Sequence, residues 1–93
     1  MRDITYVEAL KNYIMINTED KKYTIHFTMK NIENELSPDL FIRVHKSYIV
    51  NKKLIKNIDD NSLQINLGEK LKDLPLGKSY KNLIMTGINI MSG

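Results

Sequence analysis

The sequence predicts a mainly β fold, built from short strands with two or three helical turns. Two observations predict it. Short runs rich in β-branched and aromatic residues alternate with polar turns, and apolar residues follow helical spacing in only two places. The 93 residues can enclose one core but are too few for two domains, so residues 1–93 are predicted to be a single domain.

The N-terminal part predicts three strands. The first lies around residues 4–8, and the run YIMIN, residues 13–17, is the second. A polar turn at residues 19–21 leads into KYTIHFT, residues 22–28, in which apolar and polar residues alternate as in a half-buried strand. One face of this third run carries Tyr23, Ile25 and Phe27.

A short helix is predicted next. In TMKNIENELSP, Thr28 can cap the N-terminus, and Met29, Ile32 and Leu36 follow with helical spacing. The dipeptide Ser-Pro ending at Pro38 stops the helix.

The second half predicts further strands in LIKNI, SLQIN and KLKDLPL. Polar turns at residues 59–61 and 68–70 separate them. Pro75 indicates an edge strand or a strand end, because proline cannot donate to the ladder.

A second helix is predicted in SYKNLIMTGINI. Tyr80, Leu83 and Ile84 have helical offsets, Ser79 is the candidate N-cap and Gly87 the candidate stop.

Composition excludes several classes of function. The absence of cysteine removes disulfides and thiolate chemistry and suits the reducing cytoplasm, and no apolar run approaches the roughly 20 residues that span a bilayer. The two histidines, His26 and His45, have no matching carboxylate cluster, so we expect no metal site and no cofactor. Without a Gly-rich loop or a nucleophile–base pair, we expect no enzyme.

Basic residues cluster although the net charge is only +3. No acidic residue lies between Asp39 and Asp59, and no acidic residue follows Asp73. Two lysines, Lys78 and Lys81, do follow Asp73. Such clusters can form a basic face for nucleic acid. A solvated lysine-rich surface is the other interpretation, and charge alone favours it.

The stretch FIRVHKSYIVN, residues 41–51, combines apolar and basic residues. A continuous strand would place Lys46 within an apolar face, which is costly if the ammonium cannot reach water. We therefore predict that the strand ends before residues 45–47 and that the chain turns there, exposing Lys46. A helical turn is expected to follow, with Val50 and Leu54 on one face.

This stretch resembles the signature F-x-R-x-H-[RK]-S-[YF]-[IV]-[VI]-N of the LytTR family of DNA-binding domains. The segments DITYVEALKNYIMI, FTMKNIENEL and LPLGKSYKNLI resemble other parts of the family in the same order, so the similarity covers residues 3–84. The resemblance implies compact antiparallel β-sheets that read DNA with loops in successive grooves, without a recognition helix.

The implied function is sequence-specific binding of double-stranded DNA at promoter direct repeats, as the output domain of a bacterial two-component response regulator. Most members follow a phosphorylated receiver domain and carry one or two more strands before this segment, so the chain is expected to lack both. A pair of domains, or a homodimer, would occupy the DNA. The alternative is a small β-domain that mediates protein–protein interaction or dimerisation.

The resemblance also implies roles for individual residues. Base contacts are expected from Lys46 and Lys78, and from Asn12 or Tyr13, whose register is open. Phosphate contacts are expected from Lys11, His45, Ser47 and Lys81.

Three further residues are expected to have mainly structural roles. The His45 ring is expected to hydrogen-bond backbone at the junction of strand and turn, and Asn51 to cap the turn after it. Arg43 is either a phosphate contact or a structural partner of a carboxylate such as Glu8.

Overall fold

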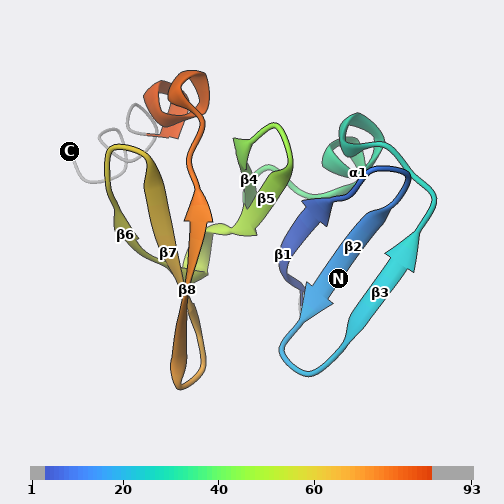
Figure 1. The fold of residues 1–93 in the computed structure, drawn as a ribbon, viewed down its shortest axis with the longest axis horizontal. Coiled ribbons are helices and arrows are strands. Elements are labelled where there is room, and N and C mark those ends of the chain that lie inside the picture. Colours follow the sequence, from blue (N-terminus) through green and yellow to red (C-terminus); the bar gives the residue numbers. More distant parts are fainter. Residues whose placement is uncertain (1–3, 85–93) are drawn as a thin grey trace.

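Eight strands form two antiparallel sheets in the part of the chain, residues 4–84, that the computed structural model describes (Figure 1). One sheet has five strands in the order β3-β2-β1-β5-β4, and the other has three in the order β6-β7-β8. The strands are β1 Ile4–Ala9, β2 Ile14–Thr18, β3 Lys22–Ile25, β4 Phe41–His45, β5 Tyr48–Asn51, β6 Ile55–Ile58, β7 Ser62–Leu67 and β8 Lys70–Pro75. The predicted mainly β fold is confirmed.

The helical parts are short. They are α1, Met29–Glu35, the 3-10 turn η1, Lys52–Leu54, and a segment that is helical from Lys78 to the last described residue, Ile84. Within residues 4–84 no helix is long and apolar enough to cross a membrane.

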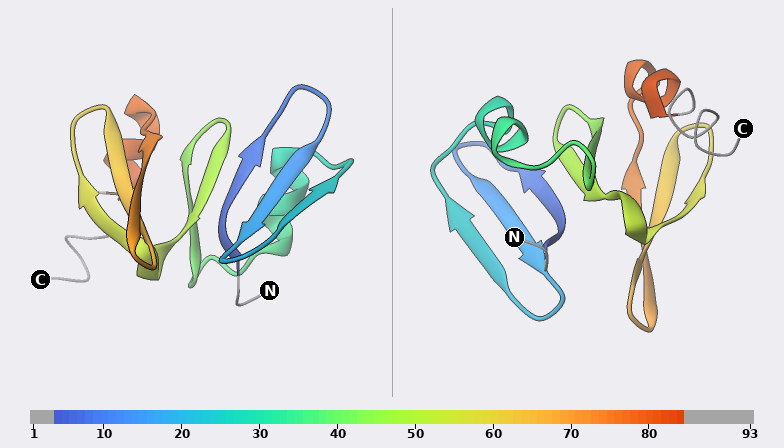
Figure 2. Two further views of the ribbon diagram at one scale, coloured as in Figure 1. Left: turned by 60° about the horizontal axis from the view of Figure 1, so that its bottom comes forward. Right: turned by 180° about the vertical axis from the view of Figure 1, so that it is seen from behind.

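The five-stranded sheet lies between two layers (Figure 2). Its first face packs against α1, and its second face packs against the three-stranded sheet and the helical segment 78–84. The first core contains Ile4, Val7, Ile14, Ile16, Met29, Ile32, Leu36, Phe41 and Ile49. The second core contains Tyr6, Val44, Val50, Leu63, Ile65, Leu74, Leu76 and Ile84.

A bulge in β1 distributes its side chains between the two cores. The register with β2 shifts between Ile4 and Tyr6, so Ile4 and Val7 both reach the first core while Tyr6 reaches the second. Thr5, at the bulge, is buried and donates its hydroxyl to the Asn17 carbonyl at 2.9 Å, and the Asn17 amide lies 3.5 Å from the Tyr6 carbonyl. These contacts satisfy the buried polar groups at the bulge.

A second bulge lies in β4, just before the predicted turn. Arg43 pairs with Ile49, and the next partners are His45 and Tyr48, so Val44 is the extra residue. Its side chain is fully buried in the second core. Bulges bend a strand and redirect side chains, and this one sets how the end of the β4–β5 hairpin leaves the sheet.

The predicted first helix is confirmed. The Thr28 side chain accepts a hydrogen bond from the Asn31 amide at 3.1 Å, which satisfies one of the free amides of the first turn. Met29 and Ile32 are buried in the first core, and the helix ends at Glu35, before the Ser-Pro dipeptide. Pro75 ends β8, an edge strand, as predicted.

Two predicted elements differ from the structure in the first half of the chain. The third strand ends at Ile25, so Phe27 lies in the connection to α1, and Tyr23 and Phe27 are largely exposed while Ile25 packs. The helical turn expected directly after residues 45–47 is instead strand β5, and η1 begins only at Lys52. This segment forms a strand because its backbone pairs with β1 on one side and with β4 on the other.

The second predicted helix differs at its start. It begins at Lys78, and the Lys81 amide donates to the Gly77 carbonyl at 2.8 Å, so Gly77 and not Ser79 occupies the N-cap position. Ile84 is buried in the second core as its spacing suggests, but Leu83 is 68% exposed. The predicted stop at Gly87 lies outside the described residues.

Candidate nucleic-acid interface

Three connections lie along one edge of the molecule, at the top of Figure 1. We call residues 10–13, between β1 and β2, the first loop. Residues 45–47, between β4 and β5, are the central loop, and residues 77–79, at the start of the last helical segment, are the third loop. Apart from Lys81, the residues for which the resemblance implied DNA contacts lie in these three loops, and the fold brings the loops into one row.

Backbone hydrogen bonds join the loops. The Ala9 amide, next to the first loop, donates to the Ser47 carbonyl at 2.8 Å. The Gly77 amide of the third loop donates to the Val44 carbonyl, also at 2.8 Å. The central loop is therefore tied to a neighbour on each side.

The His45 side chain stabilises the central loop from within. Its Nδ1 accepts a hydrogen bond from the Ser47 amide at 3.1 Å, which confirms the predicted contact with backbone. The His45 ring also meets the Tyr48 ring edge-on, with centroids 5.8 Å apart. No group of three His, Asp or Glu side chains within residues 4–84 is arranged to hold a metal ion.

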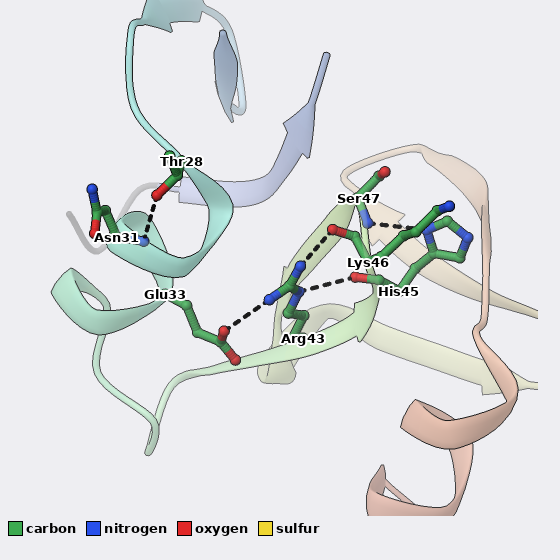
Figure 3. Close-up of polar contacts among 7 residues, drawn as sticks. All are labelled: Thr28, Asn31, Glu33, Arg43, His45, Lys46 and Ser47. Carbon is green, nitrogen blue, oxygen red and sulfur yellow. Dashed lines mark hydrogen bonds and ion pairs between the residues drawn. The ribbon is translucent and has the colours of Figure 1, made fainter. Parts of the chain in front are cut away.

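Arg43 lies beneath the central loop and contacts its backbone (Figure 3). Its Nε donates to the His45 carbonyl at 3.3 Å, and its Nη2 donates to the Lys46 carbonyl at 2.6 Å. Its Nη1 forms an ion pair with Glu33 of α1 at 3.1 Å. The side chain is only 20% exposed, so the structural alternative for Arg43 is the one that its contacts favour.

The carboxylate named for Arg43 from the sequence, Glu8, has a different partner. Glu8 accepts a hydrogen bond from the Tyr48 hydroxyl at 3.1 Å, across the β1–β5 pair. Glu33 lies ten positions before Arg43 on a different element, so neither strand alternation nor helical spacing could have paired them. Burial is the largest cause that raises the pKa of the Tyr48 hydroxyl, and the hydrogen bond to Glu8 and the nearby Glu8 charge raise this pKa further.

The two lysines predicted to contact bases are exposed. Lys46 and Lys78 reach solvent at the central and third loops, and within residues 4–84 neither forms an ion pair. In Figure 3 the Lys46 side chain extends away from Glu33 and α1. Both ammonium groups are free to meet an acceptor on a ligand.

Lys81, predicted to contact phosphate, has a partner in the protein. Its ammonium lies 2.7 Å from a carboxylate oxygen of Asp60, in the turn between β6 and β7. The hydrogen bond and charge of Lys81 hold the pKa of the Asp60 carboxyl below its usual value. The sequence contained no sign of this pair, because the residues are 21 positions apart.

The first loop has few constraints. Lys11 and Asn12 are exposed and Tyr13 is partly buried. The Leu10 amide donates to the Tyr13 carbonyl at 2.9 Å, and within residues 4–84 the side chains of Lys11, Asn12 and Tyr13 make no hydrogen bond. No side-chain hydrogen bond within that part of the chain fixes the directions in which they point.

Lys52 and Lys53 of η1, which follow β5, lie away from this row. Strand β5 starts at the central loop and runs four residues to Asn51, so η1 lies roughly 13 Å along the strand from the loop. The Asn51 Oδ1 accepts from the Lys53 amide at 3.0 Å, which confirms the predicted cap.

Comparison with known proteins agrees with this architecture. The LytTr DNA-binding domain family matches residues 1–89. The sensory transduction protein LytT of Bacillus subtilis (strain 168) is 32% identical over 81 residues, which cover 85% of this chain and 34% of that protein. The transcriptional regulatory protein LytR of Staphylococcus aureus (strain N315) is 42% identical over 43 residues, or 46% of this chain and 18% of that protein.

A solved structure has the same fold. The LytTr DNA-binding domain of a Bacillus cereus response regulator superposes with a TM-score of 0.78 at 26% identity, covering 91% of this chain and 80% of that one. The chain spans about a third of the length of the LytT proteins it matches. With the family match across almost its whole length, the chain belongs to the LytTr DNA-binding domain family.

Proposed function

We propose that this domain binds double-stranded DNA sequence-specifically and serves as the transcription-regulating output domain of a two-component response regulator. The observation that carries the proposal is the row of three loops, joined through backbone hydrogen bonds, each of which presents exposed lysine. Family membership favours DNA over a protein partner for this surface. The matched relatives are named as a sensory transduction protein and a transcriptional regulatory protein.

Lys46 and Lys78 are proposed to read base edges in the major groove. Each can donate to O6 and N7 of guanine, as a single point donor on a flexible stem. Asn12 or Tyr13 would make the base contact of the first loop. Such contacts specify sequence, whereas contacts to phosphate only fix position.

Phosphate contacts are proposed for Lys11, His45, Ser47 and Lys81. His45 has its Nδ1 occupied by the Ser47 amide, so its Nε2 is the atom left for phosphate. Lys81 must share its ammonium between Asp60 and a phosphate, or exchange one for the other. Lys11 is exposed and makes no ion pair within the described part of the chain.

The proposed arrangement on DNA is a pair of domains on promoter direct repeats, in the cytoplasm, within a longer chain that carries a receiver domain. Residues 1–93 would act as one DNA-binding unit. Loops that enter successive grooves would bend the duplex, at a deformation cost of about 1–6 kcal/mol for 40–90°.

A salt titration tests the proposal. A labelled fragment of the chain's own promoter region is titrated with the domain at several salt concentrations. We expect affinity to fall with salt, with a slope of about −0.9 in log K against log salt for each phosphate neutralised. Absence of binding at about 50 mM salt to every promoter fragment tried would contradict the proposal.

A further inference from the structure

We propose that Arg43 is a positioning residue for base readout, which acts by fixing the backbone from which Lys46 projects. This inference rests on the proposed DNA-binding function and adds a residue that would not itself touch DNA.

The four successive backbone carbonyls of residues 44 to 47 all accept hydrogen bonds from donors outside these residues. The Val44 carbonyl accepts from the Gly77 amide, and the Ser47 carbonyl accepts from the Ala9 amide. The two carbonyls between them, of His45 and Lys46, both accept from the Arg43 guanidinium. Arg43 therefore donates to two of these four carbonyls, and they are the two closest to the Lys46 side chain.

Arg43 is itself held in place from two other elements. Glu33 of α1 binds Nη1, and the guanidinium carbon lies 5.7 Å from the centre of the Tyr80 ring, within cation–π range. The planar guanidinium thus links α1, the central loop and the last helical segment. With 20% exposure and three of its five N–H groups engaged by Glu33 and the two carbonyls, it is poorly placed to bind phosphate directly.

The flexibility of the lysine side chain makes it important that the loop backbone is fixed. A lysine donor has several rotatable bonds, so its base selectivity depends on where its backbone starts and in which direction it leaves. A fixed loop backbone reduces the ordering that binding requires. Arg43 provides that fixation through two carbonyls at once, which a single ammonium cannot reproduce with the same planar fork.

Arg43→Lys is therefore the informative substitution, because it keeps the charge and removes the fork. Wild type, Arg43→Lys, Lys46→Ala and the double variant are compared on the promoter fragment and on a random fragment of equal length, at one salt concentration. The quantity measured is the ratio of the two affinities. Thermal unfolding of each variant sets a temperature at which all four are folded.

We expect Arg43→Lys to lower the ratio by about tenfold while leaving affinity for random DNA unchanged, and the double variant to match Lys46→Ala. That non-additivity is the signature of action through Lys46, and a general structural role would not produce it. Glu33→Gln is the matched control. It removes the charge of the ion pair but keeps a side-chain oxygen that can accept from Nη1, so both carbonyl contacts should remain and its ratio should stay within about twofold of wild type.

Several results would overturn the inference. An unchanged ratio in Arg43→Lys, additive losses in the double variant, or equal losses on both fragments would each do so. If wild type shows no preference for any promoter fragment, the proposed function fails as well, so the two failures are distinguishable. Should Arg43→Lys not fold, the same cycle is measured with Arg43→Gln, from which the same non-additive loss is expected.

Discussion

The central and first loops have the same proposed task but differ in how they are held. Through the central loop and the residue before it, the four carbonyls of residues 44 to 47 accept hydrogen bonds from Gly77, Arg43 and Ala9, and the His45 ring binds the Ser47 amide. The first loop has the single backbone bond from Leu10 to Tyr13. The central loop is preorganised, whereas the first loop can adjust its side chains on the ligand.

Position in the row explains part of the difference, and the Arg43 and His45 side chains of the same hairpin explain the rest. The central loop lies between the other two and receives hydrogen bonds from both sides, while the first loop has a neighbour on one side only. Preorganised groups lose less freedom on binding. Sequence discrimination should therefore depend more on the central loop than on the first.

The largest expected effect follows from that comparison. Lys46→Ala should cost about 1–3 kcal/mol of discrimination between promoter and random DNA, and Lys78→Ala a similar amount. Asn12→Ala, in the less constrained first loop, should cost less than Lys46→Ala. Competition binding with both fragments measures this, and a larger loss for Asn12→Ala than for Lys46→Ala would reverse the ranking of the loops.

A substitution at Gly77 tests the tie between the central and third loops. A Cβ at Gly77 would lie 2.8 Å from Cδ2 of Tyr80 and 3.7 Å from Cα of His45, so Gly77→Ala must displace the Tyr80 ring. We expect a loss of about 1 kcal/mol in unfolding free energy and weaker promoter binding.

Gly68→Ala is the matched control. Gly68 has φ +75°, which disfavours other residues, but a Cβ there meets nothing within 4 Å. It lies in the β7–β8 turn, at the opposite end of β7 from the loops (Figure 1). A similar loss of stability, about 1 kcal/mol, should leave DNA binding unchanged. Equal effects on DNA binding would show that stability, and not loop placement, is being measured.

A smaller effect is expected at the Asp60–Lys81 ion pair, next to the third loop. Asp60→Asn releases Lys81, so promoter and random DNA should both bind more tightly, and the salt slope should steepen by up to about 0.9. Asp59→Asn removes the same charge from the same turn without breaking the ion pair. The two variants are compared by salt titration, and identical slopes would exclude a specific role for the Asp60–Lys81 pair.

The smallest effect concerns the contact below the first and central loops. Tyr48→Phe removes the hydrogen bond to Glu8, which should lower the unfolding free energy by about 0.5 kcal/mol at pH 9, because the bond is partly exposed.

The pH dependence has a defined sign. The pKa of Tyr48 is raised on folding from 10.0, so its contribution is complete below pH 10 and disappears as pH rises through the folded-state pKa. Urea unfolding at pH 9 and pH 11 should show the difference between wild type and variant shrinking. Other groups titrate in both proteins, so a constant difference would exclude this contribution.

Local patterns predicted many of the elements. Apolar spacing with a Thr28 cap located α1, β-rich runs between polar turns located most strands, and the conflict around Lys46 located the central turn. These signals are short-range, since hydrogen bonds within a helix and turn chemistry depend on neighbours in the chain. The third strand was predicted too long, because the sequence could not show that Phe27 would lie exposed beyond the end of an edge strand.

The sequence by itself determined the family, the mainly β class and the exposure of Lys46. Only the tertiary structure decided that the three loops form a row, that Arg43 binds Glu33 and the carbonyls of the central loop, and that Lys81 pairs with Asp60. The Arg43 contacts with the loop carbonyls are local, within three residues along the chain. The other contacts join elements separated along the chain. Their partners are selected by sheet pairing and by the two bulges, which turn side chains toward one core or the other, and no local pattern encodes that choice.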